Sequence, residues 1–129
     1  MSARFHLGDV LSVTTGVLLS PDGIGGVYRI LQHLAGHPVY THQIPRVSRE
    51  AKPVLLAQFP ALAGVNVEGV TAENYLARLA ELATEYGECF DVQSAPSDAI
   101  QDIDPVSELA ELVHPSKIIV VNADDGGSR

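Results

Sequence analysis

Glycine and proline divide this sequence into short segments, and that punctuation restricts the possible fold more than any other feature. The chain has 11 glycines and 8 prolines, and several of them stand where an apolar repeat stops. Gly16, Gly36 and Gly87 each follow an amphipathic stretch, as expected of the left-handed residue that ends a helix. The sequence therefore predicts short helices and short strands. No apolar run approaches the roughly 18 residues that a membrane span needs.

Helical signals occur in five segments. The predicted helices cover residues 10–15, 24–34, 48–58, 71–86 and a final stretch that starts at Asp104-Pro105. Asp9 and Thr71 are predicted N-caps, because their side-chain oxygens can accept hydrogen bonds from the free amides of a first turn. Pro53 either kinks the third helix or delays its start.

Strand signals occur in residues 39–43, 65–68, 89–93 and 118–121. The last segment is a β-branched run, Ile118 to Val121, which favours a buried strand. We predict an α+β domain in which a small three- or four-stranded sheet packs against three to four helices. Residues 1–121 are expected to form a single domain, and residues 122–129 a flexible C-terminal tail.

Cysteine content and the N-terminus indicate the compartment. A lone cysteine, Cys89, excludes an intramolecular disulfide and favours reducing surroundings. Its position beside Phe90 in a predicted strand favours a buried, inert thiol. The first residues lack the apolar region of a signal peptide. We expect a soluble protein of the cytoplasm.

Charge is distributed unequally along the chain. Residues 1–60 carry a net charge of +2 and residues 61–129 a net charge of −10. An acidic half of this kind repels phosphates and attracts basic partners, so direct nucleic-acid binding is disfavoured. We predict a partner-binding surface whose main residues are Glu81, Glu85, Asp98, Asp102 and Glu108. The alternative is a solvated face that only keeps the protein soluble.

Three residues could form a catalytic or metal-binding cluster. Two imidazoles and a carboxylate, from His6, Asp9 and His42, would suit zinc or general acid–base chemistry. The alternative is structural, with Asp9 as an N-cap and the histidines bonded to backbone groups. Because the motif is loose, we assign no metal site and expect no cofactor.

The densest polar stretch is residues 41–46, Thr-His-Gln-Ile-Pro-Arg. His42 could act as a base and Arg46 as an anion clamp. Alternatively, Thr41 and Gln43 face solvent and His42 packs inward. The glycine-rich residues 22–26 lack the spacing of a nucleotide-binding loop, and no serine lies in a nucleophile-elbow context. The sequence favours a binding module over an enzyme.

Several segments resemble a group of small phage and prophage proteins of uncharacterised function. The matching residues are 5–16 (FHLGDVLSVTTG), 18–21, 26–28 and 40–46 (YTHQIPR), with Asp104-Pro105-Val106 and Glu108-Leu109 resembling the C-terminal element of the group. The resemblance implies a setting in a bacterial host cell and supplies no mechanism. By analogy, small acidic phage proteins include inhibitors of bacterial defence systems such as anti-CRISPR proteins.

We therefore expect a phage or prophage accessory protein that acts by protein–protein binding. Its expected partner is a host protein or ribonucleoprotein complex with a basic groove, which the acidic half would block. One alternative is a metal- or acid–base-dependent enzyme built on His6, Asp9 and His42. Another is a phage accessory or structural protein that forms a homodimer or larger homo-oligomer through an exposed apolar stripe.

Overall fold

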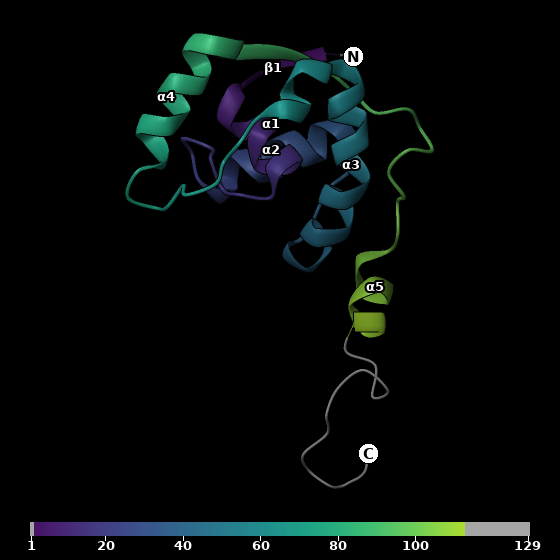
Figure 1. Ribbon diagram of the computed structural model, residues 1–129. Helices are drawn as coiled ribbons and strands as arrows, with labels where there is room; N and C mark the ends of the chain where they lie inside the picture. Colours follow the sequence, from purple (N-terminus) through teal and green to yellow (C-terminus); the bar gives the residue numbers. More distant parts are fainter. Residues whose placement is uncertain (1, 113–129) are drawn as a thin grey trace, which may run out of the picture.

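The first strand of the fold lies at the very start of the chain. A computed structural model describes residues 2–112 (Figure 1). In chain order the elements are β1 (Ser2–His6), α1 (Leu7–Thr15), α2 (Ile24–Ala35), the 3₁₀ helix η1 (Thr41–Gln43), α3 (Ile44–Gln58), the 3₁₀ helix η2 (Pro60–Gly64), α4 (Tyr75–Tyr86), β2 (Cys89–Gln93) and α5 (Pro105–Leu112). The predicted α+β class is confirmed.

The sheet is smaller than we predicted. Within the described residues it consists of β1 and β2, paired antiparallel with Phe5 opposite Phe90. Residues 65–68 form no strand, and residues 41–43 are a 3₁₀ turn instead of extended chain. The prediction missed strand β1, although its five residues, Ser-Ala-Arg-Phe-His, alternate between polar and apolar side chains. The predicted strand 118–121 and the predicted tail 122–129 lie outside the described residues.

The core forms where α1, α2 and α3 pack against one another and against the two strands (Figure 1). As expected from the composition, its fully buried side chains are mainly aliphatic, among them Leu11, Ile30 and Leu55. Cys89, which we expected to be buried, is exposed at the first position of β2. Leu76 of α4 is also exposed, although the apolar residues of that segment suggested a buried face.

Helix boundaries differ from the predictions where a side chain has a tertiary role. His6 caps α1, because its Nδ1 accepts a hydrogen bond from the Gly8 amide at 2.9 Å. Asp9, our predicted cap, lies inside the first turn and is only 3% exposed. Helix α3 begins at Ile44, four residues earlier than expected, and includes Pro53. Thr71 caps the turn that precedes α4 and not the helix itself.

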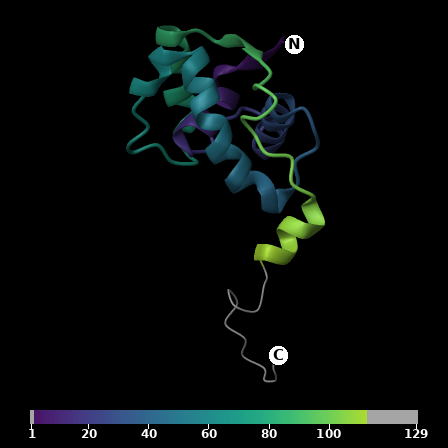
Figure 2. The same ribbon diagram turned by 90° about the vertical axis from the view of Figure 1, so that its right-hand side faces the viewer.

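A long arm leads from the sheet to the last helix. Residues 94–104 run down one side of the molecule to α5, which lies at its lower end (Figures 1 and 2). Among the contacts that fix the arm, the Ala95 amide donates to the Leu34 carbonyl at 3.0 Å, and Ile100 is buried in the core. This arm determines where the acidic second half of the chain meets the basic first half.

Candidate binding surface

The site begins with the polar stretch 41–46, which forms η1 and the first turn of α3. Gln43 is buried, and its side-chain oxygen accepts a hydrogen bond from the Tyr40 amide at 3.1 Å. This bond closes the turn and leaves Tyr40 half exposed beside it. The tight turn places His42, Gln43 and Arg46 on the same side, facing the arm. Gln43, which we predicted to face solvent, is therefore one of the most buried polar residues.

The backbone of the arm is held by two of these side chains. Nε2 of His42 lies 2.8 Å from the Pro105 carbonyl oxygen, and Nε2 of Gln43 donates to the Ile103 carbonyl at 3.1 Å. The two bonds fix the backbone at the start of α5 to η1. His42 thus has the structural role that we considered alongside catalysis.

Arg46 completes the attachment of α5. Its Nε donates to Oε2 of Glu108 at 2.7 Å and its Nη2 to Oε1 at 3.0 Å, while Nη1 reaches Glu50 and the Gln101 carbonyl. The Arg46 and Glu108 side chains are only 12% and 11% exposed. The paired hydrogen bonds from Arg46 hold the pKa of Glu108 below its ordinary value and raise the pKa of Arg46. Because both side chains are largely covered, solvent and salt screen this pair less than an ordinary surface salt bridge.

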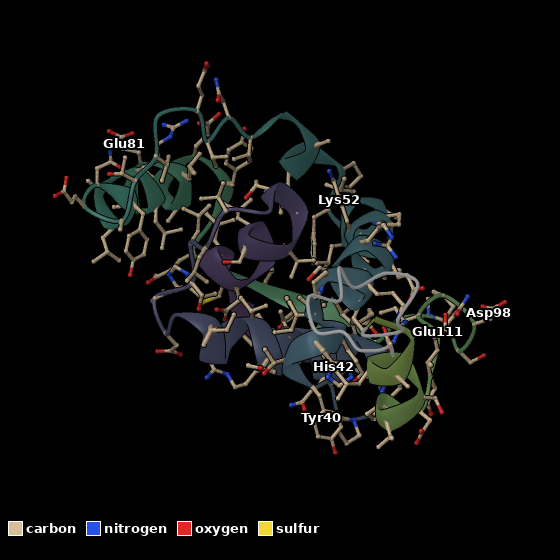
Figure 3. The ribbon with its side chains drawn as sticks, turned by 90° about the horizontal axis from the view of Figure 1, so that it is seen from below. Tyr40, His42, Lys52, Glu81, Asp98 and Glu111 are labelled. Carbon is tan, nitrogen blue, oxygen red and sulfur yellow. The ribbon has the colours of Figure 1, made fainter. Side chains whose placement is uncertain are left out.

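An apolar patch remains exposed beside the attached helix. Tyr40 is 51% exposed, Val106 75% and Leu109 44%, and the three residues line one shallow hollow of about 600 Å³ together with Thr41, His42 and Pro105. Tyr40 and His42 lie close to α5 in Figure 3. Large exposed apolar side chains grouped in this way mark interaction sites more often than isolated ones do. We call Tyr40, Val106 and Leu109 the α5 patch.

Acidic residues surround this end of the molecule. Asp98 and Asp102 are exposed on the arm, and Glu111 is exposed near the end of α5 (Figure 3). Asp102 also approaches His37, with 3.8 Å between Oδ1 and Nε2. Asp104 accepts hydrogen bonds from the amide and hydroxyl of Ser107, and so caps α5 at the position where the sequence predicted a helix start. The acids of the arm and of α5 therefore lie at the same end of the molecule as the α5 patch (Figure 3), and we call Asp98, Asp102 and Glu111 its acidic border.

The five predicted partner-binding residues do not form one face. Glu81 and Glu85 lie on α4, at the opposite end of the molecule from α5 (Figures 1 and 3), and Arg78 pairs with Glu81 at 3.0 Å. Asp98 and Asp102 lie on the arm. The carboxylate of Glu108 is engaged by Arg46 and Gln43. The structure thus brings together Asp98, Asp102 and α5, and separates them from the acids of α4.

His6, Asp9 and His42 have separate partners. His6 caps α1 and lies 4.0 Å from Glu88, whereas His42 contacts the Pro105 carbonyl. Asp9 accepts a hydrogen bond from the buried Ser20 hydroxyl at 2.5 Å. In the part of the chain that the structure describes, no three His, Cys, Asp or Glu residues are arranged to hold a metal ion. The residues present do not fit a three-ligand metal centre.

Comparison with known families gives one match. Residues 5–65 match the model of a domain of unknown function, DUF7736. No curated protein and no solved structure matches the chain. The matched DUF7736 region runs from the last two residues of β1 through η2, and it therefore contains His42, Gln43, Arg46 and Glu50. These residues contact the arm and α5, and both of those segments lie beyond the end of the matched region.

Within residues 2–112, no helix is long and apolar enough to cross a membrane.

The sequence analysis selected His42, Arg46 and Glu108 as candidate residues. It did not pair Arg46 with Glu108, because 62 positions separate them in the sequence. It missed Tyr40 and Val106 as surface residues. Each is a large apolar residue close to a proline in the sequence, and nothing in that local pattern distinguishes it from a core residue.

Proposed function

We propose that this protein is a binding module whose α5 patch and acidic border engage a basic protein surface. The observation that carries the proposal is the exposure of Val106 and Leu109 on α5, which Arg46 and Gln43 hold in place beside the exposed Tyr40. A preformed apolar patch costs little conformational entropy on binding, because its side chains and backbone are already ordered.

The two kinds of side chain have different roles in this proposal. Val106, Leu109 and Tyr40 act as anchors that lose water on binding, as central interface residues do. Asp98 and Asp102 act at the border, where charges mainly accelerate association and select a partner of opposite sign. The partner surface that fits is an apolar recess with lysine or arginine residues around it.

The biological role that we propose is inhibition of a bacterial defence complex in the host cytoplasm by a phage or prophage protein. The resemblance of residues 5–16 and 40–46 to small phage proteins supports the setting. The acidic charge of the second half supports a partner with a basic groove, including a ribonucleoprotein. Direct contact with nucleic acid is not part of the proposal, because the arm and α5 between residues 94 and 112 contain no lysine or arginine.

The test is an affinity pull-down from bacterial lysate at about 50 mM and about 300 mM salt, a range over which exposed charges become screened. We expect a stoichiometric partner that is retained best at low salt. Val106→Ser/Leu109→Ser should abolish retention, and Asp98→Lys/Asp102→Lys should weaken it mainly at low salt. Each variant must keep the wild-type circular dichroism spectrum.

Glu81→Lys/Glu85→Lys is the matched control, because it makes the same charge change on α4. If this variant loses the partner and the arm variant does not, the binding surface is on α4 and the proposal is wrong. Self-association that Val106→Ser/Leu109→Ser removes, with no other partner captured, would instead assign the patch to a homodimer.

A further inference from the structure

A second hollow lies on a different part of the molecule from the α5 patch. It has a volume of about 490 Å³ and lies between the last turn of α1, the middle of α3, η2 and residues 65–68. Lys52 marks its position in Figure 3, well separated from His42 and Tyr40. The volume is within the range of small-molecule sites in proteins.

One lining residue has an unmet hydrogen-bonding need. Thr14 is only 6% exposed, and within residues 2–112 its hydroxyl oxygen has no hydrogen-bond partner. A buried hydroxyl without a partner destabilises the folded state, because it has lost its hydrogen bonds to water. The neighbouring Thr15 hydroxyl has no such deficit, since it donates to the Leu11 carbonyl and accepts from the Val17 amide. The hollow that Thr14 lines is the space from which a partner could come.

The lining also carries two opposite charges. Lys52 extends from α3 and Glu68 from the loop that follows η2. Among the described residues neither side chain forms an ion pair, although both line the same hollow. Helix α1 ends at this hollow with no basic residue in its own last turn, so its C-terminus adds a partial negative charge to the lining.

Aliphatic side chains form another part of the wall. Leu56, Leu62, Val65 and Val67 line the hollow, together with Thr15, Ala63 and Asn66. A ligand that complements this arrangement needs an anionic group, a cationic group and an aliphatic body. Free amino acids and short peptides with aliphatic side chains have this combination.

We propose that this hollow binds a small zwitterion, an amino acid or dipeptide with a branched aliphatic side chain. Lys52 receives its carboxylate, and Glu68 with the C-terminus of α1 receives its ammonium group. The aliphatic chain packs on Leu56 and Leu62, and Thr14 gains a hydrogen-bond partner. Seven of the ten lining residues lie inside residues 5–65, so the site belongs mainly to the DUF7736 region.

The first experiment is an NMR titration of the full-length ¹⁵N-labelled protein with L-leucine and with glycyl-L-leucine. We expect saturable amide shifts at residues 14–16, 52–56 and 62–68. N-acetyl-L-leucine lacks the ammonium group and L-leucinamide lacks the carboxylate, so both should bind at least about tenfold more weakly, the loss that one charge-assisted hydrogen bond typically causes. Equal binding of all four compounds, or no saturable shift with either zwitterion, would overturn the proposal.

Variants separate this site from nonspecific binding. Lys52→Gln and Glu68→Gln should each weaken binding of the zwitterion about tenfold. Arg49→Gln removes a charge from the same exposed helix outside the hollow, and should leave binding unchanged. Thr14→Val should raise the melting temperature of the unliganded protein and also weaken binding. A Thr14→Val variant with a lower melting temperature would show that the hydroxyl has a structural partner, and would contradict this role.

Discussion

The guanidinium of Arg46 and the carboxylate of Glu108 meet in a two-bonded fork, with 2.7 Å and 3.0 Å between the bonded atoms. One residue lies in the first turn of α3 and the other in α5, so this pair joins the DUF7736 region to the end of the described chain. Charged groups that are this largely covered need their partners, because an unpaired charge in such a place is costly. The position of the α5 patch therefore depends on this pair.

Reversing either charge should release α5. We expect Arg46→Glu or Glu108→Arg to reduce the free energy that holds α5 by about 1–3 kcal/mol, because the charge-assisted bonds are lost and like charges face each other. Amide hydrogen exchange of residues 105–112 should accelerate accordingly, while that of α1 and α2 stays slow. The double variant Arg46→Glu/Glu108→Arg restores an opposite pair and should recover part of the protection. A double variant no more protected than the single ones would show that the fork does not hold α5.

Acid should release α5 in a defined pH range. Because the pKa of Glu108 is lower in the folded state than its ordinary value of 4.5, its contribution is fully present above 4.5. This contribution is lost as the pH falls through the lowered folded value. Hydrogen exchange or NMR of α5 at decreasing pH measures this loss. Glu108→Gln should remove this pH-dependent step, and a step that survives in Glu108→Gln would have to be assigned to another carboxylate.

Gly26 should not tolerate any side chain. Helix α2 lies so close to the Asp9–Ser20 hydrogen bond that a Cβ on Gly26 would overlap the Ser20 hydroxyl and the Asp9 carboxylate. We expect Gly26→Ala to destabilise the fold by several kcal/mol, or to prevent folding. Gly25→Ala is the matched control, since a Cβ there meets no atom within 4 Å and alanine favours a helix. Thermal unfolding that affects both variants equally would refute this explanation.

His6 and His42 should act independently of each other. His6→Ala removes the cap of α1 and should cost about 1 kcal/mol, whereas His42→Ala removes a bond to the Pro105 carbonyl and should loosen α5. The effects should add in the double variant, because the two side chains share no partner. Unfolding free energies and exchange rates of the three variants test this. A strongly non-additive result would indicate that the two histidines belong to one site.

The sequence correctly predicted the helices and strands whose ends are determined by residues nearby in the sequence. Helix α2 and its end at Gly36, strand β2 and the start of α5 at Asp104-Pro105 follow from periodicity, left-handed glycine and capping, all of which act within a few residues. The α+β class follows from these elements.

Tertiary structure alone decided the partners. Asp9 stands where the sequence predicts an N-cap. In the fold it is a buried hydrogen-bond acceptor for Ser20, with Gly26 packed closely against it. Glu108 was predicted from the sequence to be an exposed acid. In the fold it is bound by Arg46, which lies 62 positions away in the sequence. The acids of α4 and of the arm belong to the same acidic half of the sequence. In the fold, however, they lie on opposite sides of the molecule (Figure 1). A sequence shows which groups are available within one helix turn, whereas the packing of distant segments determines which of them remain free to bind.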